Sequence, residues 1–412
     1  MFFSLRRGGL LLAAALIAVG AGTALASPAQ ALTAWSPPVQ LPGACGAALA
    51  VNAAGTEVAA GSQQNPDNTV SVQACTSADG QTWSAPVTVG RGYNPVVAIA
   101  PDGRVVVVWR STTEAGVSAS VRPPGGQWGP AVTASGGPYR DLVVGIDGSG
   151  NAIAAWMTGG NAVDTASLPA GAKKWTKITT LATQGQAVDL AVNATGAAII
   201  TWATRSGAFA ASGTVLGGFG APVTLGPPPG YPIGHTRVVL NGQGEAAAAW
   251  VSGLGADLVA TRSADGSWAP AATLSTTPYG RIDVAIDGAG NAVTIFGQQY
   301  GSNPNIISAA YTSARPAGGT WSTPALLSAP GDTATSLHVA ADPAGTFVVS
   351  WLDTTTGGAL TVLTSPPGSG FGPGTTFPAS AFGDLKIAPG RAVLSFTPPP
   401  GAPMSTSTEP VS

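Results

Sequence analysis

A hairpin signal that occurs eight times along the chain constrains its fold more than any other feature. Each copy places Asp, Asn or a small residue shortly before a glycine, between two apolar and β-branched runs, as in 97–109. Glycine supplies the positive φ of a tight turn, and an Asx side chain bonds its own backbone there. The turn glycines recur every 45 to 55 residues, at Gly55, Gly103, Gly150, Gly196, Gly244, Gly290, Gly345 and Gly390.

A second element lies between these hairpins and completes a four-stranded unit. It carries Trp or Phe, often followed by Pro and a short apolar run, as in Trp-Ser-Ala-Pro-Val-Thr-Val at 83–89. A turn and another short strand precede this element in seven copies, so each period holds four strands, A to D. Four-stranded antiparallel units at a period of roughly 40–50 residues are the signature of β-propeller blades. The sequence therefore predicts an all-β chain that forms a single β-propeller.

The chain length and its two ends predict the number of blades. Eight units of about 48 residues need about 384 residues, and the segment 33–412 supplies 380. The first copy, at Trp35, is a lone D strand, whereas the C-terminus ends after strands A, B and C, the last near 404–408. The two ends together would complete one blade and remove exposed sheet edges. We expect eight blades; seven blades is the alternative, and an open two-domain arrangement is the third possibility.

The first 31 residues have the pattern of a secretory signal peptide. Arg6 and Arg7 precede an apolar stretch at 10–21 that is short for a membrane span, and small-residue cleavage patterns follow. We expect cleavage after Ala26 or Ala31, with the propeller over residues 32–412. The mature chain is then predicted to be secreted and extracellular, without a transmembrane anchor.

The composition excludes several classes of function. Charged residues make up 9% of the chain and the formal net charge is −2. The chain therefore lacks the clustered basic face that nucleic acid or an anionic membrane requires. Two His and two Cys are too few for a His/Cys metal cage. We expect no nucleic-acid partner, no metal, no cofactor and a monomeric protein.

The connections from each D strand to the next A strand carry the candidate functional residues. In a propeller these connections and the B-to-C loops emerge on one face, around the central channel. Four of the six Tyr lie in these few residues. Aromatic rings offer stacking surfaces and Arg offers planar paired donors, a combination that suits sugars or carboxylates. The ligand-binding candidates are Tyr93, Tyr139, Arg140, Tyr231, Arg237, Tyr279 and Arg281, with Glu114 on a B-to-C loop. The alternative is that these side chains only plug the channel.

Two turns before D-strand tryptophans resemble the Asp-box of sialidase-like propellers, Ser/Thr-x-Asp-x-Gly-x-x-Trp. They are Ser-Ala-Asp-Gly-Gln-Thr-Trp at 77–83 and Ser-Ala-Asp-Gly-Ser-Trp at 263–268, one and two residues shorter than the usual form. The repeat is also similar to exported propellers of high-GC bacteria, over essentially all of the mature chain. The resemblance implies that the boxes stabilise turns, so Asp79 and Asp265 are interpreted as structural.

The same resemblance implies an enzymatic alternative. Sialidases use an Arg cluster, a Tyr nucleophile assisted by Glu, and an Asp acid/base. Here only Glu114 could reach the site, with Tyr139 or Tyr93 as nucleophile; the Arg-Ile-Pro motif is missing, and those enzymes have six blades. We predict an exported non-catalytic binding propeller that recognises a glycan, a cell-wall polymer or a cell-surface protein. A sialidase-like glycoside hydrolase and a purely structural surface protein are the alternatives.

The two cysteines leave one question open. An even count in an oxidising compartment favours a disulfide. The repeat register instead places Cys45 at the mouth of strand A and Cys75 low on strand C, near opposite ends of the first blade. A bridge needs Cα atoms within about 7 Å. A Cys45–Cys75 disulfide and two free thiols are therefore equally compatible with the sequence.

Overall fold

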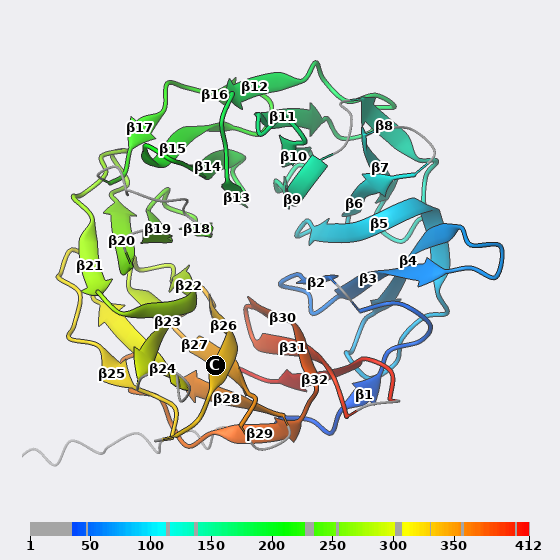
Figure 1. The fold of residues 1–412 in the computed structure, drawn as a ribbon. Helices are drawn as coiled ribbons and strands as arrows, with labels where there is room; N and C mark the ends of the chain where they lie inside the picture. Colours follow the sequence, from blue (N-terminus) through cyan, green and yellow to red (C-terminus); the bar gives the residue numbers. More distant parts are fainter. Residues whose placement is uncertain are drawn as a thin grey trace, which may run out of the picture. The chain divides into compact units, whose positions relative to one another are not determined.

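The computed structural model describes residues 35–46, 48–112, 116–135, 139–226, 235–252, 255–300, 307–329, 331–355, 358–399 and 402–411. The chain divides into two compact units, 1–32 and 33–412. The expected signal peptide lies outside the described residues. The second unit consists of β-strands and their connections (Figure 1). Among the residues described, no helix has the length and apolar character needed to cross a membrane.

The strands of the second unit form antiparallel sheets in which chain order runs outward from an inner strand. The inner strands are β2 (Ala48–Val51), β5 (Val87–Ile99), β9 (Tyr139–Ile146), β13 (Ala187–Val192), β18 (Thr236–Leu240), β22 (Pro278–Ile286), β26 (Ala334–Ala341) and β30 (Ala381–Ala388). Their partners are β3 (Glu57–Gln64), β6 (Val105–Ser111), β10 (Ala152–Thr158), β14 (Ala197–Thr204), β19 (Ala246–Ser252), β23 (Ala292–Tyr300), β27 (Phe347–Asp353) and β31 (Arg391–Thr397).

Two further layers of strands complete each sheet. The third strands are β4 (Val70–Ser77), β7 (Gly116–Arg122), β11 (Val163–Leu168), β15 (Gly207–Thr214), β20 (Ala256–Arg262), β24 (Ile307–Arg315), β28 (Ala359–Ser365) and β32 (Ser405–Glu409). The outer strands are β1 (Val39–Gln40), β8 (Val132–Ser135), β12 (Thr179–Ala182), β16 (Gly218–Phe219), β17 (Val223–Thr224), β21 (Ala272–Ser275), β25 (Ala325–Leu326) and β29 (Thr375–Pro378). The long β5 is also the outer strand of the β2–β4 sheet, so that seven strands, β2 to β8, form one continuous sheet.

The predicted turns and buried aromatic positions are confirmed. All eight turn glycines have positive φ, between 79° and 103°. The second strands are buried on both faces; Val105 to Trp109, for example, are at most 1% exposed. Their large aromatic residues pack between neighbouring sheets, as Trp156 does in a cluster that also contains Val106 of the preceding sheet. The apolar core is therefore a series of contacts between successive sheets.

The N-terminal strand joins the C-terminal sheet, as predicted. β1 pairs with β32 through Val39 opposite Thr406, which completes the order β1-β32-β31-β30. Each inner strand contacts the inner strand of the next sheet, and β30 contacts β2. Figure 1 shows the sheets arranged radially, with the inner strands nearest a common centre. The sheets of the second unit thus form a propeller-like arrangement in which the two ends of the chain meet.

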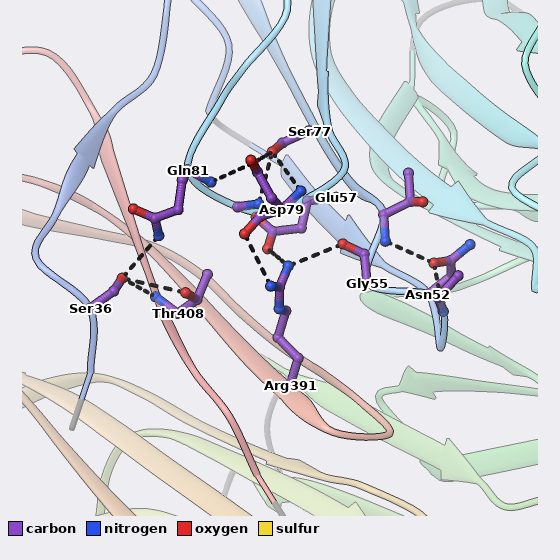
Figure 2. A network of polar contacts seen from close by, with 12 residues as sticks. Ser36, Asn52, Gly55, Glu57, Ser77, Asp79, Gln81, Arg391 and Thr408 are labelled. Carbon is purple, nitrogen blue, oxygen red and sulfur yellow. Dashed lines mark hydrogen bonds and ion pairs between the residues drawn. The ribbon is translucent and has the colours of Figure 1, made fainter. Parts of the chain in front are cut away.

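A polar network crosses the junction between the first and last sheets (Figure 2). Arg391 of β31 donates to the Glu57 carboxylate of β3 at 3.1 Å and to the carbonyl oxygens of Gly55 and Asp79. Burial raises the pKa of Glu57 to about 7, although the charge of Arg391 opposes the rise. The carboxylate is fully buried, so this pair depends strongly on protonation.

Cys45 and Cys75 form a disulfide, with Cα atoms 6.0 Å apart. The expectation that they lie near opposite ends of the first sheet is wrong for Cys45, because β2 begins only at Ala48. The preceding turn instead crosses β3 and β4, where the N–H of Ala44 reaches the side chain of Gln73 at 3.4 Å. A Cβ on Gly61 would lie 1.7 Å from the Ala44 carbonyl oxygen, so this crossing requires glycine.

Candidate functional site

The inner strands are irregular near their first residues. Register shifts between the inner strand and its partner occur in five sheets, those of β5, β9, β22, β26 and β30. Asn94, Asp141 and Ser336 take positive φ of 50°, 41° and 51° at three of these shifts. A β-bulge bends its strand and redirects a side chain, and bulges are common next to binding sites. Local backbone geometry therefore turns side chains out of the regular alternation at this end of the strands.

A cleft of about 590 Å³ lies at the bulged ends of the later inner strands. Its polar and aromatic lining comes from β18, β22, β26 and β30, and includes Arg237, Arg281, His338, Phe382 and Lys386. The His338 and Phe382 rings are stacked with their centroids 4.3 Å apart. The cleft therefore combines an aromatic surface with cationic hydrogen-bond donors.

Ionisable side chains occupy one repeated position along five successive inner strands. This position lies four residues before the turn position that holds Asn or Asp in most copies. Acid and base alternate at this position, in the order Asp189, Arg237, Asp283, His338 and Asp384. We call these five residues the charged collar. At the same position β2, β5 and β9 carry Ala48, Val96 and Val143. The collar is therefore charged on one side of the channel and apolar on the other.

Asp283 is the central acid of the charged collar. Its Oδ1 lies 3.5 Å from Nε of Arg237, and its Oδ2 lies 3.6 Å from Nδ1 of His338. Burial alone would raise the pKa of Asp283, but the charge of Arg237 and contacts with His338 and a backbone N–H hold it at about 2. Arg237 also lies 4.0 Å from Asp189, whose pKa is raised by burial despite the attraction. The arginine is thus shared between two carboxylates.

The three collar carboxylates also join neighbouring inner strands. Backbone N–H groups donate across the sheet boundary: Val238 to Asp189 at 2.9 Å, Val339 to Asp283 at 3.2 Å, and Leu49 to Asp384 at 3.3 Å. These acid side chains are 11–19% exposed, whereas the side chains of Arg237 and Lys386 are 31% and 43% exposed. The carboxylates therefore join strands, and the cations that pair with them are the more exposed partners.

Two further polar groups lie near the cleft. Burial, followed by the charge of Arg237, lowers the pKa of His235 to about 3, so its imidazole is neutral. Burial raises the pKa of Asp141, while the charges of Arg140 and Arg281 both oppose that rise. Arg140 and Arg281 were predicted from separate connections, and the charges of both lower the pKa of the same carboxyl group, that of Asp141.

The structure brings together only part of the predicted site. Arg237 and Arg281 line the cleft. Arg140 is exposed and donates to the Asn161 side chain. Tyr93 is 42% exposed on β5 and is not part of the cleft lining. The remaining predicted residues that lie outside the described part of the chain are Tyr231, Glu114 and the side chain of Tyr279.

Tyr139 is buried in the first position of β9. Its side chain is 7% exposed, and burial raises its pKa. Within the described residues its hydroxyl has no hydrogen-bond partner. Proton transfer requires a carboxylate within hydrogen-bond reach. The described structure therefore gives no support to Tyr139 in the sialidase-like alternative.

Sequence reasoning missed four members of the site: His338, Phe382, Asp384 and Lys386. A signal for two of them was present, because His338 and Asp384 fall on the same repeat position as Arg237. Alignment of the eight copies on their turns shows the acid–base alternation directly. The D-to-A connections alone do not include His338 and Asp384, which hold this position.

The two degenerate Asp-boxes stabilise turns, as the resemblance implied. Oδ1 of Asp79 accepts the backbone N–H groups of Gln81 and Thr82, at 2.9 and 2.7 Å, and the Ser77 hydroxyl. The two backbone bonds are the main reason that the pKa of Asp79 falls to about 2. Asp265 accepts from the backbone and the hydroxyl of Ser267. Both carboxylates are thus engaged locally.

Comparisons with known proteins identify the fold. No family model and no curated protein matches the chain. The Dos1 propeller structure is 10% identical, with a TM-score of 0.58 over 92% of this chain and 95% of that one. The BP39L lectin from Burkholderia pseudomallei is 13% identical, with a TM-score of 0.55 over 81% of this chain and 99% of that one. The described sheets therefore belong to the β-propeller class.

A match to a sialic-acid enzyme does not extend this conclusion. The intramolecular trans-sialidase from Ruminococcus gnavus is 11% identical, with a TM-score of 0.39 over 77% of this chain and 90% of that one. A likeness at that level carries no argument about activity, because one fold serves many functions.

Proposed function

We propose that the protein is an exported, non-catalytic propeller of eight blades that binds a carbohydrate in the cleft formed by Arg237, Arg281, His338, Phe382 and Lys386. The observation that carries this proposal is the division of roles at the cleft. Buried carboxylates hold the strands, while exposed cations and an aromatic surface face the solvent.

The contacts between inner strands support eight blades. Contacts run from β2 through β5, β9, β13, β18, β22, β26 and β30, and return to β2. Each of these strands begins an antiparallel run of four, if β5 counts both as the outer strand of one blade and the inner strand of the next. A closed ring of this kind leaves little sheet edge exposed, which is the usual advantage of propeller closure.

The chemistry of the cleft favours a carbohydrate over the other predicted ligands. Its volume of about 590 Å³ is within the usual range of small-ligand sites, roughly 300–1,000 Å³. Arg281 and Lys386 offer charge-assisted donors to hydroxyl or carboxylate oxygens. The stacked rings of His338 and Phe382 offer a flat face at the same place. One structural neighbour is a lectin, which is consistent with this choice.

The disulfide supports the export part of the proposal. Disulfides persist in oxidising compartments and are uncommon in reducing ones. The Cys45–Cys75 bridge lies in a buried cluster with Leu41, Leu49 and Ala59. The apolar stretch at 10–21 supplies a route to such a compartment.

A glycan-array screen of the chain from Ser27 onward tests the proposal. The Arg281→Ala and Lys386→Ala variants should lose at least tenfold in affinity for any glycan that the unmodified chain binds, as expected for a charge-assisted hydrogen bond of about 1.5–3 kcal/mol. Arg205→Ala is the matched control, because Arg205 is exposed and does not line the cleft. Equal loss in the control, or no glycan bound by folded protein, would refute carbohydrate recognition at this cleft.

A further inference from the structure

Three cavities follow one another along the inner strands. The cleft shares Arg237, His338, Asp384 and Lys386 with a second cavity of about 510 Å³. The second cavity shares seven residues with a third one of about 440 Å³ at the turn end of the strands. Those seven are Ile99, Ile146, Val192, Leu240, Ile286, Ala341 and Ile387. Neighbouring cavities in this series share lining residues at both boundaries, and we call the series the bore.

The far end of the bore is ringed by aliphatic side chains. The residue directly before the Asx turn is apolar in every repeat: the seven shared residues and Val51. We call these eight residues the aliphatic collar. All but Ile146 remain partly exposed. These apolar side chains converge from every inner strand and stay partly open to solvent. A ligand that covers them removes apolar surface from water, which favours binding.

Small apolar residues line the wall between the two collars. One position before the aliphatic collar, the lining residues are Ala98, Gly145, Ala191, Val239, Ala285 and Ala340, with Lys386 at the same position on β30. The two collars are three residues apart along each strand, which corresponds to about 10 Å. The aliphatic collar therefore lies about 10 Å along the strands from the charged collar, and most side chains between the two are small and apolar.

We propose that the bore binds an anionic amphiphile, with its head at the charged collar and its alkyl chain directed toward the aliphatic collar. The head-group end of this site shares Arg237 and Lys386 with the proposed carbohydrate cleft, whereas the aliphatic collar lies outside that cleft. The aliphatic collar favours an alkyl chain, because covering its partly exposed side chains removes apolar surface from water.

At the charged collar the acceptor groups are already hydrogen-bonded, whereas donor groups can still bind a ligand. This difference favours a negative head group. The three acids there, Asp189, Asp283 and Asp384, each accept a backbone N–H from the next strand. By contrast, no hydrogen bond among the described residues uses the Arg237 guanidinium, whose Nε lies 3.5 Å from Oδ1 of Asp283. Lys386 is bonded to Asp384 but remains 43% exposed. A sulfonate or carboxylate head would accept from Arg237 and Lys386.

Calorimetric titration of the folded chain with sodium alkylsulfonates, from hexyl to decyl and below their micelle concentrations, tests the proposal. We expect one equivalent to bind, with affinity rising about fourfold for each added methylene. Alkyltrimethylammonium and alkyl maltoside compounds of the same chain lengths should bind at least tenfold more weakly. Affinity that does not change with chain length, binding of many equivalents, or no detectable binding would each overturn the proposal.

Two pairs of variants locate the site. Leu240→Asn should weaken decylsulfonate at least tenfold and hexylsulfonate little, whereas Leu326→Asn, at an exposed outer-strand leucine, should change neither. Lys386→Gln should weaken all chain lengths by a similar factor, and Lys174→Gln, on an exposed loop, should not. Equal effects in a variant and its control would refute the placement. Arg281→Ala, which impairs only the carbohydrate cleft, should leave the chain-length dependence intact.

Discussion

Glu57 connects the closure of the propeller to pH, and its replacement by Gln provides a direct test. The side chain is fully buried on β3, where one oxygen meets Arg391 of β31 at 3.1 Å. Among the described residues the other oxygen has no hydrogen-bond partner. The network of Figure 2 therefore places an ionisable acid at the junction of the first and last sheets. Glu57→Gln keeps the shape and removes the titration.

The expected magnitude follows from the pKa. Burial raises the pKa of Glu57 from 4.5 to about 7, and this value already includes the opposing effect of Arg391. Each unit corresponds to about 1.36 kcal/mol, so the ionised carboxylate destabilises the folded state by about 3 kcal/mol relative to the protonated one. A raised carboxyl pKa means that the folded state holds the proton longer. Stability due to Glu57 is therefore greatest below about pH 4.5 and falls until about pH 7.

Urea unfolding monitored by tryptophan fluorescence, at several values between about pH 4 and about pH 8, measures this effect. The quantity of interest is the free energy of unfolding of Glu57→Gln minus that of the unmodified protein. We expect this difference to rise by about 3 kcal/mol from the acidic to the alkaline end. Comparing the two proteins at each pH cancels the other titrating groups, including Asp257, whose pKa burial raises to about 8.

Parallel pH profiles for the two proteins would refute this reasoning. A difference that stays constant within about 1 kcal/mol would mean that Glu57 ionises as easily when folded as when unfolded. A difference that falls with pH would mean that the attraction of Arg391 exceeds the cost of burial. Either result would remove the pH-sensitive closure inferred from Figure 2.

Three further perturbations have defined outcomes. The double variant Cys45→Ala/Cys75→Ala should lose about 2–4 kcal/mol of stability in urea unfolding, and an unchanged midpoint would contradict a stabilising bridge. Trp250→Ala, at a fully buried side chain between sheets, should cost about 3–5 kcal/mol; a calorimetric loss below about 1 kcal/mol would contradict that packing. Asp283→Asn should cost about 2 kcal/mol near neutral pH, because a pKa held at about 2 stabilises only the ionised form. That cost should vanish below about pH 2. An equal cost near neutral pH and below about pH 2 would show that the charge of Asp283 is not involved.

The strand-and-turn layout of this protein could be predicted from local sequence alone. Tight hairpins require residues that tolerate positive φ, so Gly103 and its seven equivalents mark the turns without knowledge of any distant contact. The pairing of β1 with β32 was also predictable, because one end of the sequence lacks the strand that the other end supplies. These features repeat at fixed intervals, and a repeat can be read along the chain.

The candidate site was predictable only in part. Arg237 and Arg281 were found because they stand out in a chain with few charges. His338 and Asp384 were not, because each is unremarkable in its own strand and gains its role from neighbours about 50 residues away. The position of Cys45 was misjudged for a related reason. The register of the other repeats does not apply where the chain enters the first sheet through a turn that crosses β3 and β4.

Local chemistry specified where this chain turns, which segments become strands and how its ends complement each other, since those properties depend on residues that are close in sequence. The tertiary structure decided the features to which each sheet contributes one residue. The charged collar, the bore and its aliphatic collar exist only because inner strands from the whole length of the chain lie side by side. The alternation of Asp and base can be read from aligned repeats, but the contacts of each acid with the next strand exist only in that ring.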